Sequence, residues 1–199
     1  MNELSDRHHG DLIAVDPSVN SPGVALFRHG VLEACERIKI PKDVSKLGYG
    51  ARCLRVAQEI AAWWQEQGER EVVRVVVFEW PQTYRETKSK GDHNQLLGLV
   101  GVGQSLAALV TGHNVLTGQR PPEIVTPTPA EWTGQLPKTV DGSLPSDPWT
   151  SPRGIRIGDR LEIGERRVVP PQHDAIDALG LGLWALGRYR PRRAFSGVT

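Results

Sequence analysis

The chain is poor in cysteine and has no long uninterrupted apolar run. Cys35 and Cys53 are the only two cysteines in 199 residues, and they share no close spacing. They suit neither a zinc site nor a disulfide framework, so we expect a reducing compartment such as the cytoplasm. The longest apolar stretch, LLGLVGVGQSLAALV, is too short for a membrane span and is interrupted by Gln104 and Ser105. The first residues, MNELSDRHHGD, lack the apolar region of a secretory signal. We therefore expect no membrane partner.

An excess of charge of one sign is also lacking. The sequence has 24 Lys and Arg residues against 23 Asp and Glu residues. Overall charge therefore says little about partners, and any surface for nucleic acid must be local. The length favours one domain spanning residues 1–199.

The apolar pattern predicts an α/β fold. Three extended segments, 11–16, 24–27 and 31–40, are joined by short turns and predict an antiparallel meander. The segment VVRVVVFE is almost entirely apolar, as expected of a central strand covered on both faces. After the meander the pattern predicts a helix, a strand, a helix, a strand and a helix at about 47–68, 72–79, 96–110, 123–127 and 173–186.

Residues 139–171 are rich in Pro, Gly and Arg and form the least regular part of the sequence. Two interpretations stay open for them. The segment holds one or two short helices around Ile157 and Leu161, or it forms a hairpin from GIRIGDRLEIG. The chain then ends in a basic tail, residues 188–199.

Four acidic residues lie where a site in an α/β fold is expected. Asp16 ends the first strand, Glu79 ends the fourth, and Asp174 and Asp177 open the last helix. Such folds place their ligands in a cleft beyond the carboxyl ends of the strands. Four carboxylates gathered there would repel one another unless a cation offset them. This is the composition of a Mg²⁺ or Mn²⁺ site, and paired metals of this type drive phosphodiester cleavage.

Each acid also has an ordinary structural interpretation. Asp16 precedes Pro17, and Asp-Pro commonly starts a turn. Glu79 could be a solvated strand end. Asp174 could cap the last helix, with Asp177 as the reciprocal acid of a capping box. Residues three apart share one helix face, so capping and metal binding can coexist. The joint occurrence of the four acids in this order favours the catalytic interpretation.

The order of the elements and the acids within them resembles the RNase H-like nuclease superfamily and, more narrowly, the RuvC family of Holliday-junction resolvases. The resemblance is carried by IAVDPS followed by Gly23, by VVVFEWP, and by HDAIDALGLGLW. The stretch PAEWTGQLPK, residues 129–138, also resembles a segment of phage and prophage RuvC-like proteins. The implied fold is a mixed five-stranded sheet with helices on both faces.

The resemblance also implies an activity. It implies a metal-dependent endodeoxyribonuclease that cuts Holliday junctions or other branched DNA and leaves 5′-phosphate and 3′-hydroxyl ends. Asp16 would bridge two Mg²⁺ ions, which Mn²⁺ could replace; Glu79 and Asp174 would hold one ion each, and Asp177 would complete the second. We expect a homodimer in a bacterial or phage-infected cell, with the glycine-rich helix 96–110 as part of the dimer face.

Other residues are candidates for supporting roles. His173 is an outer group or proton shuttle, or a structural residue at a helix start; Lys138 contacts phosphate or orients water, or is a solvated loop lysine. Tyr84 follows Glu79 by five residues and could stack on a base. The candidate phosphate contacts are the basic residues of the same loop and of the tail, which could also be solvated charges: Arg85, Lys88, Lys90, Arg188, Arg190, Arg192 and Arg193.

Two rival functions remain. An ATP-binding protein of the actin and sugar-kinase type also opens with a strand, an Asp and a phosphate-binding turn. Here that turn, DPSVNSPG, is poorer in Gly, Ser and Thr than a phosphate loop requires, and the chain is short for two lobes. A catalytically silent relative that binds branched DNA is the second rival, and the presence of all four acids argues against it.

Overall fold

The structure is a computed structural model that describes residues 10–68, 72–81, 93–133, 139, 143–162, 164–170 and 172–189. Its strands are β1 (Asp11–Asp16), β2 (Gly23–Arg28), β3 (Val31–Arg37), β4 (Val73–Phe78) and β5 (Glu123–Val125). Its α-helices are α2 (Tyr49–Glu66), α3 (His93–Leu116), α4 (Pro129–Trp132), α5 (Pro152–Gly158) and α6 (His173–Ala185). Short 3₁₀ helices are η1 (Lys42–Lys46), η2 (Pro148–Thr150) and η3 (Glu165–Val168).

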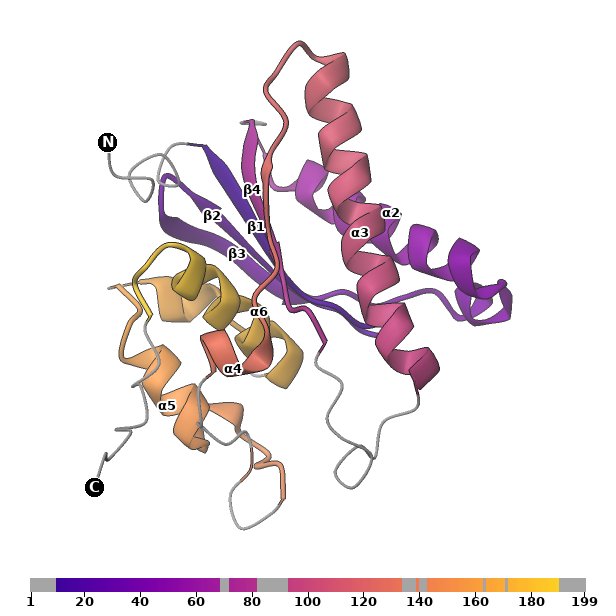
Figure 1. The fold of residues 1–199 in the computed structure, drawn as a ribbon. Helices are drawn as coiled ribbons and strands as arrows, with labels where there is room; N and C mark the ends of the chain where they lie inside the picture. The colour runs from indigo at the N-terminus through magenta and orange to yellow at the C-terminus, as the bar shows by residue number, and fades with distance from the viewer. Residues whose placement is uncertain are drawn as a thin grey trace, which may run out of the picture.

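The strands form one mixed sheet in the order β3-β2-β1-β4-β5 (Figure 1). β1, β2 and β3 pair antiparallel, whereas β4 pairs parallel with both β1 and β5. At the β2–β3 turn Arg28 pairs with Val31, and the two linking residues have positive φ, 49° at His29 and 80° at Gly30. This is the conformation that suits the right-handed twist of a two-residue hairpin. The predicted meander and the predicted α/β fold, a mixed five-stranded sheet with helices on both faces, are confirmed.

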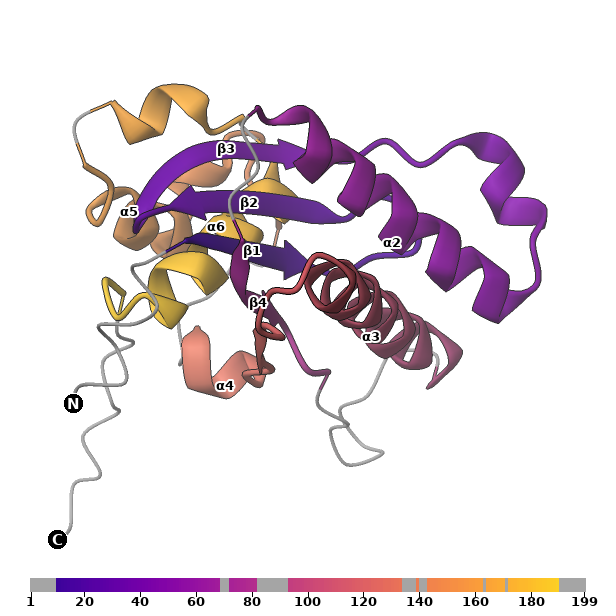
Figure 2. The ribbon, with the colours of Figure 1, turned by 90° about the horizontal axis from the view of Figure 1, so that it is seen from above.

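Alternate residues of the central strands feed two separate cores. Leu12 and Ala14 of β1 face α6, while Ile13 and Val15 face α2 and α3. Figure 2 shows α2 and α3 on one face of the sheet and α4, α5 and α6 on the other. Because both faces of β1 and β4 are covered, the sequence of each strand is apolar with almost no alternation.

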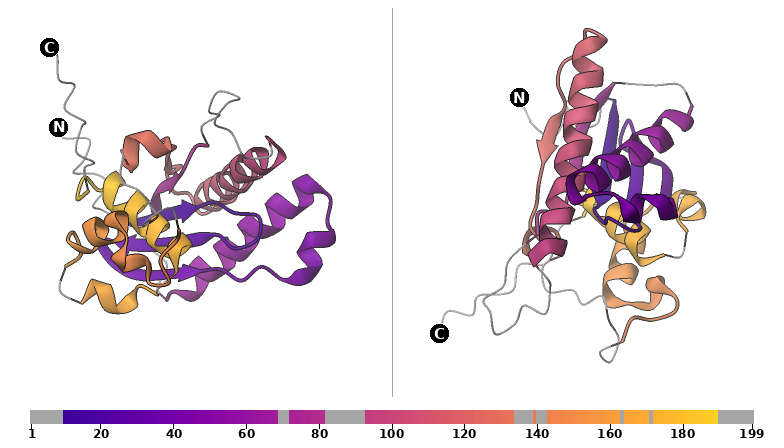
Figure 3. Two further views of the ribbon diagram at one scale, coloured as in Figure 1. Left: turned by 90° about the horizontal axis from the view of Figure 1, so that it is seen from below. Right: turned by 90° about the vertical axis from the view of Figure 1, so that its right-hand side faces the viewer.

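Helix α3 is longer than the sequence predicts. Residues Leu96–Leu116 are long and apolar enough to cross a membrane, so the expectation that this stretch is too short for a membrane span is wrong. Length and composition alone are weak support for a span, because a core helix of a soluble protein passes the same test. One side of α3 is buried in the core through Val102, Leu106 and Val110, and α3 lies beside α2 (Figure 3).

Three glycines of α3, Gly98, Gly101 and Gly103, serve packing inside the chain. A Cβ at Gly101 would stand 2.8 Å from the Cys53 sulfur on α2, and one at Gly103 would overlap the Phe78 ring on β4. The expected close packing is confirmed, and its partners are α2 and β4. The glycines themselves therefore give no support to a dimer face.

Of the two open interpretations of residues 139–171, the helical one is confirmed and the hairpin is wrong. Ser151 caps α5 by accepting a hydrogen bond from the Gly154 N–H at 3.0 Å, and Pro152 occupies the first helical position. A Cβ at Gly154 would overlap the carbonyl oxygen of Pro148, so η2 and α5 pack backbone against backbone. Local capping therefore overrides the apolar alternation that suggested strands.

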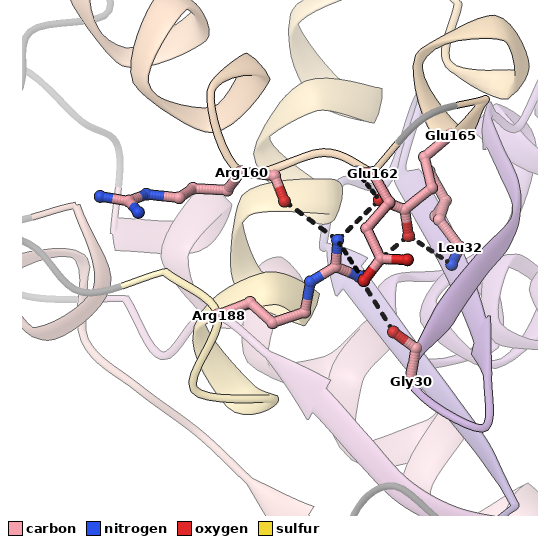
Figure 4. A network of polar contacts seen from close by, with 6 residues as sticks. All are labelled: Gly30, Leu32, Arg160, Glu162, Glu165 and Arg188. Atoms are coloured by element: carbon pink, nitrogen blue, oxygen red, sulfur yellow. Dashed lines mark hydrogen bonds and ion pairs between the residues drawn. The ribbon is translucent and has the colours of Figure 1, made fainter.

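A polar network joins the end of α6 to the rest of this segment (Figure 4). Arg188 Nη1 and Nη2 lie 2.9 and 2.7 Å from the two carboxylate oxygens of Glu165, and Arg188 also donates to the carbonyls of Gly30 and Arg160. The Leu32 N–H donates to Glu165 at 2.9 Å. The Arg188 side chain is only 16% exposed. Its predicted role as a phosphate contact of the tail is therefore corrected: Arg188 links α6, η3 and the β2–β3 turn.

Candidate active site

Asp16 and Glu79 lie at the same end of neighbouring strands. The parallel register of β1 and β4 runs to the pair Val15 and Phe78. Asp16 is the last residue of β1 and Glu79 directly follows β4, so the register brings both to the carboxyl edge of the sheet. The backbone therefore agrees with the prediction that the carboxyl ends of the first and fourth strands lie side by side.

Asp174 is brought to the same edge by contact between β2 and α6. Asp16 pairs with Gly23 across β1 and β2. A Cβ built on Gly23 would overlap the carbonyl oxygen of Asp174, so the first turn of α6 rests directly on the start of β2. Gly23 therefore connects Asp16 to Asp174 through backbone contacts alone.

The Asp174 carboxylate is partly exposed and contacts two donors. Arg37 Nε lies 3.3 Å from Asp174 Oδ2, and the Ser21 hydroxyl donates to the same oxygen at 3.4 Å. Ser21 and Arg37 also line a cleft of about 470 Å³, together with Lys39 and Gln172. The cleft thus opens beside Asp174 and carries two cationic side chains.

Asp177 is buried against an arginine from α5. It is 4% exposed, and Arg153 Nη1 lies 3.1 Å from its Oδ1. The Arg153 side chain is 16% exposed. A carboxylate removed from water needs such a partner, since an unpaired buried charge is strongly unfavourable.

Glu79 accepts a hydrogen bond from Trp132, which is 1% exposed. The distance from Trp132 Nε1 to Glu79 Oε2 is 2.6 Å. Helix α4, which carries Trp132, starts with a capping box between Thr128 and Glu131, and the hydrogen bonds from Thr128 lower the pKa of the Glu131 carboxyl. The capping box is the local reason that a four-residue helix keeps Trp132 in place.

The donor set suits a hard cation, but the side chains are not gathered around one. Carboxylates from β1, the end of β4 and α6 are the oxygen ligands that Mg²⁺ prefers. Among the residues that the structure describes, no three His, Cys, Asp or Glu side chains are grouped closely enough to hold an ion. Asp174 and Asp177 each contact an arginine, and Glu79 contacts an indole. Binding of a cation at Asp174 and Asp177 would require their arginine contacts to change, whereas Glu79 could keep its hydrogen bond from Trp132.

The predicted auxiliary residues have different outcomes. The His173 Nε2 lies 3.0 Å from the carbonyl oxygen of Pro145, a contact that ties the start of α6 to the segment before η2. The remaining predicted residues lie outside the described part of the chain: Lys138, Tyr84, Arg85, Lys88, Lys90, Arg190, Arg192 and Arg193.

The chain is similar in structure to RuvC and to a mitochondrial Holliday-junction resolvase. Thermus thermophilus RuvC in complex with a Holliday junction substrate has 16% identity and a TM-score of 0.49, covering 92% of this chain and 99% of that chain. Another T. thermophilus RuvC structure has 13% identity and a TM-score of 0.46, covering 91% and 99%. The yeast mitochondrial resolvase Ydc2 has 13% identity and a TM-score of 0.45, covering 89% and 78%. No protein-family model and no curated protein sequence matches the chain.

Sequence reasoning missed four residues that contact the predicted acids: Ser21, Arg37, Trp132 and Arg153. The stretch PAEWTGQLPK was singled out as a resemblance, yet Trp132 within it was not assigned a role. Arg37 follows the alternating pattern of β3 and looks like any solvated strand residue. No signal local to the sequence distinguishes Arg153 from its neighbours Arg156 and Arg160.

Proposed function

We propose that the chain is a metal-dependent endodeoxyribonuclease that cuts Holliday junctions or other branched DNA, leaving 5′-phosphate and 3′-hydroxyl ends. The observation that carries the proposal is the meeting of three elements at one edge of the sheet. The register of β1 and β4 brings Asp16 beside Glu79, and the contact between Gly23 and α6 brings Asp174 to the same edge.

Asp16, Glu79, Asp174 and Asp177 are the residues that would hold Mg²⁺ or Mn²⁺, two ions per site in the proposed arrangement. Bound there, such ions activate water and stabilise the departing 3′-oxygen of a phosphodiester. Asp16 ends the central strand β1, between β2 and β4, and is therefore the natural residue for a shared ligand. The cations would neutralise the carboxylates, so that the site as a whole does not repel the DNA phosphate.

The cleft beside Asp174 is the proposed path for one DNA strand. Its lining holds two cationic side chains, Arg37 and Lys39, against one carboxylate, Glu36, and this excess of positive charge favours a phosphate backbone. Asn20, Ser21 and Gln172 add polar groups that suit sugar and phosphate oxygens. A strand held there would approach the acids from the side of β3.

We also propose that the chain works as a homodimer, because a junction resolvase cuts two strands symmetrically. Gly98, Gly101 and Gly103 of α3 pack inside the chain, so the outward side of α3 is the proposed contact. That side exposes Leu97, Ala108 and Val115. Sedimentation velocity of the wild-type chain and of Ala108→Glu would test it: the substitution should turn a dimer into a monomer, and a wild-type monomer would refute the proposal.

Cleavage of a panel of branched DNAs by the wild-type chain and by Asp16→Asn tests the function. The panel holds a four-way junction, a fork, a flap and a linear duplex, each with Mg²⁺ and with EDTA. We expect Mg²⁺-dependent cleavage of a branched DNA by the wild type. Asp16→Asn removes one charge at nearly constant volume, so it should abolish cleavage while leaving junction binding and the unfolding temperature nearly unchanged.

The same panel separates the rival functions. Junction binding by the wild type without cleavage of any DNA would identify a silent DNA-binding relative. Nucleotide binding without junction binding would favour the ATP-binding alternative. Cleavage by Asp16→Asn at the wild-type rate would show that Asp16 is not a residue of the active site.

A further inference from the structure

Trp132 and Arg153 contact each other, and through them Glu79 is connected to Asp177. Trp132 donates to Glu79 at 2.6 Å. The guanidinium carbon of Arg153 stands 5.4 Å from the centre of a ring of Trp132, within cation–π range. Arg153 in turn pairs with Asp177 at 3.1 Å. The sequence of contacts from Glu79 through Trp132 and Arg153 to Asp177 is thus continuous.

The fold makes specific room for this arrangement. A Cβ at Gly180 of α6 would stand 2.7 Å from the Trp132 ring and 2.8 Å from Ile157 of α5. Absence of a side chain there lets Trp132 and α5 both pack on α6. Trp132 is 1% exposed and Ile157 is fully buried, so neither side chain has space to move aside.

Asp174 and Asp177 each pair with an arginine, but the two ion pairs differ in their exposure to water. Arg37 and Asp174 are 49% and 32% exposed, so their ion pair is screened by water. Arg153 and Asp177 are 16% and 6% exposed, and Arg153 is also stacked on Trp132. Arg153 therefore offsets the charge of Asp177 at a place that water reaches poorly.

We propose that Trp132 and Arg153 are positioning residues of the nuclease site. Trp132 fixes the orientation of the Glu79 carboxylate toward a metal ion, and Arg153 holds Asp177 as a counter-ion that a bound metal must displace. The inference rests on the proposed function. The inference also gives residues 139–171 a role at the nuclease site, because α5 lies in this segment and supplies Arg153.

The two residues should change metal affinity in opposite directions. Groups that orient a metal ligand typically contribute 10- to 100-fold to metal affinity. Trp132→Phe keeps a ring and removes the N–H donor, so Mn²⁺ should bind about 10- to 100-fold more weakly. Arg153→Gln removes the cation that pairs with Asp177 and competes there with a metal ion. Mn²⁺ should therefore bind roughly threefold to tenfold more tightly.

The chain offers a matched control for each variant. Arg166 stacks on Trp149 at 4.5 Å, and Trp149 packs against the same core as Trp132. Neither residue of this second stacked pair contacts a candidate acid in the described contacts. Trp149→Phe and Arg166→Gln should therefore leave Mn²⁺ affinity within twofold of the wild type.

Titration calorimetry with Mn²⁺ at pH 8, without DNA, decides the question, and thermal unfolding of each variant shows whether it is folded. A double-substitution cycle guards against a purely structural loss. If Trp132 acts through Glu79, Glu79→Gln combined with Trp132→Phe should bind Mn²⁺ no more weakly than Glu79→Gln alone. An additive loss, or unchanged affinity in Trp132→Phe, would overturn the role of Trp132.

Weaker or unchanged Mn²⁺ binding by Arg153→Gln would overturn the role of Arg153. These failures differ from a failure of the proposed function. If the wild-type chain and Asp16→Asn both show no Mn²⁺ binding, the metal site itself is refuted and the positioning roles with it. If the wild type binds Mn²⁺ and Asp16→Asn does not, the site stands and the Trp132 and Arg153 variants alone decide the inference.

Discussion

Gly23 and Asp174 touch backbone to backbone, although they are far apart in the sequence. A Cβ at Gly23 would overlap the carbonyl oxygen of Asp174 and crowd the Ala175 nitrogen. The contact sets how closely α6 approaches the sheet at the edge where Asp16 lies. It also explains why a glycine stands at the first position of β2, where nothing about its backbone angles requires one.

Gly23→Ala should therefore destabilise the fold. The added methyl group meets backbone atoms, which cannot rotate away, and the expected loss is about 3 kcal/mol of unfolding free energy. Urea unfolding followed by circular dichroism measures it. Gly50→Ala is the matched control, because the space around Gly50 is open and the residue lies in α2, where Ala is favoured over Gly. Equal stabilities of the two variants would contradict the contact.

Glu165→Gln should destabilise the chain at neutral pH and much less in acid. Burial of the Glu165 carboxyl opposes ionisation, but hydrogen bonds from Arg188, from the Glu162 and Leu32 N–H groups, and the charge of Arg188 outweigh it, so the pKa of Glu165 lies below its ordinary value. A carboxyl whose folded pKa is depressed stabilises the fold above its unfolded pKa, and this contribution is lost as the pH falls through the folded pKa. The loss on substitution should be about 3 kcal/mol at pH 7.

Urea unfolding of the wild type and of Glu165→Gln across pH 7 to 3 tests this dependence. The difference between them should shrink below about pH 4.3, where the carboxyl of the unfolded chain starts to be protonated. Glu59→Gln is the control, because Glu59 pairs with Arg55 on the surface of α2 at 2.7 Å. It should cost less than about 0.5 kcal/mol. A difference for Glu165→Gln that stays constant with pH would exclude the proposed stabilisation by the ionised carboxyl.

Deletion of residues 190–199 should weaken the salt dependence of junction binding. Arg188 belongs to the folded network, so the tail contributes Arg190, Arg192 and Arg193. Each phosphate contact contributes about one unit to the slope of log affinity against log salt on duplex-like arms. Fluorescence anisotropy with a labelled junction over a range of NaCl concentrations gives the slope. An unchanged slope would show that the tail makes no phosphate contact.

Tyr84→Ala should weaken binding of branched DNA more than binding of linear duplex. Its position five residues after Glu79 puts it on the chain leaving the candidate site. Stacking on one unpaired base is worth about 1–3 kcal/mol. Tyr84→Phe keeps the ring and should bind like the wild type. Equal losses on branched and linear DNA in the anisotropy assay would contradict stacking at a branch point.

Much of the fold is determined locally and could be predicted. The inner residues of β1, and all of β4 except Arg74, are apolar because both faces of these strands are covered, and such runs are visible in one sequence. The helices α2 and α6 follow from apolar residues at helical spacing. The acids Asp16, Glu79 and Asp174 stand at element boundaries, so a correct order of elements was enough to expect them at one edge of the sheet.

The sequence distinguished the two acids of β1 only by their order along the strand and indicated no partner for Asp11. Asp11 and Asp16 both flank the same apolar run, yet Asp11 is fully buried, paired with Arg28 at 3.1 Å and bonded to the Trp64 indole at 3.2 Å. Direction in the sheet distinguishes them: Asp11 stands at the opening end of β1 and Asp16 at the carboxyl end. Which end faces helices and which faces a cleft depends on packing of segments distant in sequence.

The partners of the acids were decided by the tertiary structure alone. Trp132 reaches Glu79 from a helix 53 residues further along the chain, and Arg153 reaches Asp177 from a segment whose sequence suggested strands as readily as helices. A hydrogen bond or ion pair depends on distances of about 3 Å, which no periodicity records. Local patterns of apolar and acidic residues were enough to predict which elements form and where the acids stand in them. What each acid touches depends on how α4, α5 and α6 pack on the sheet.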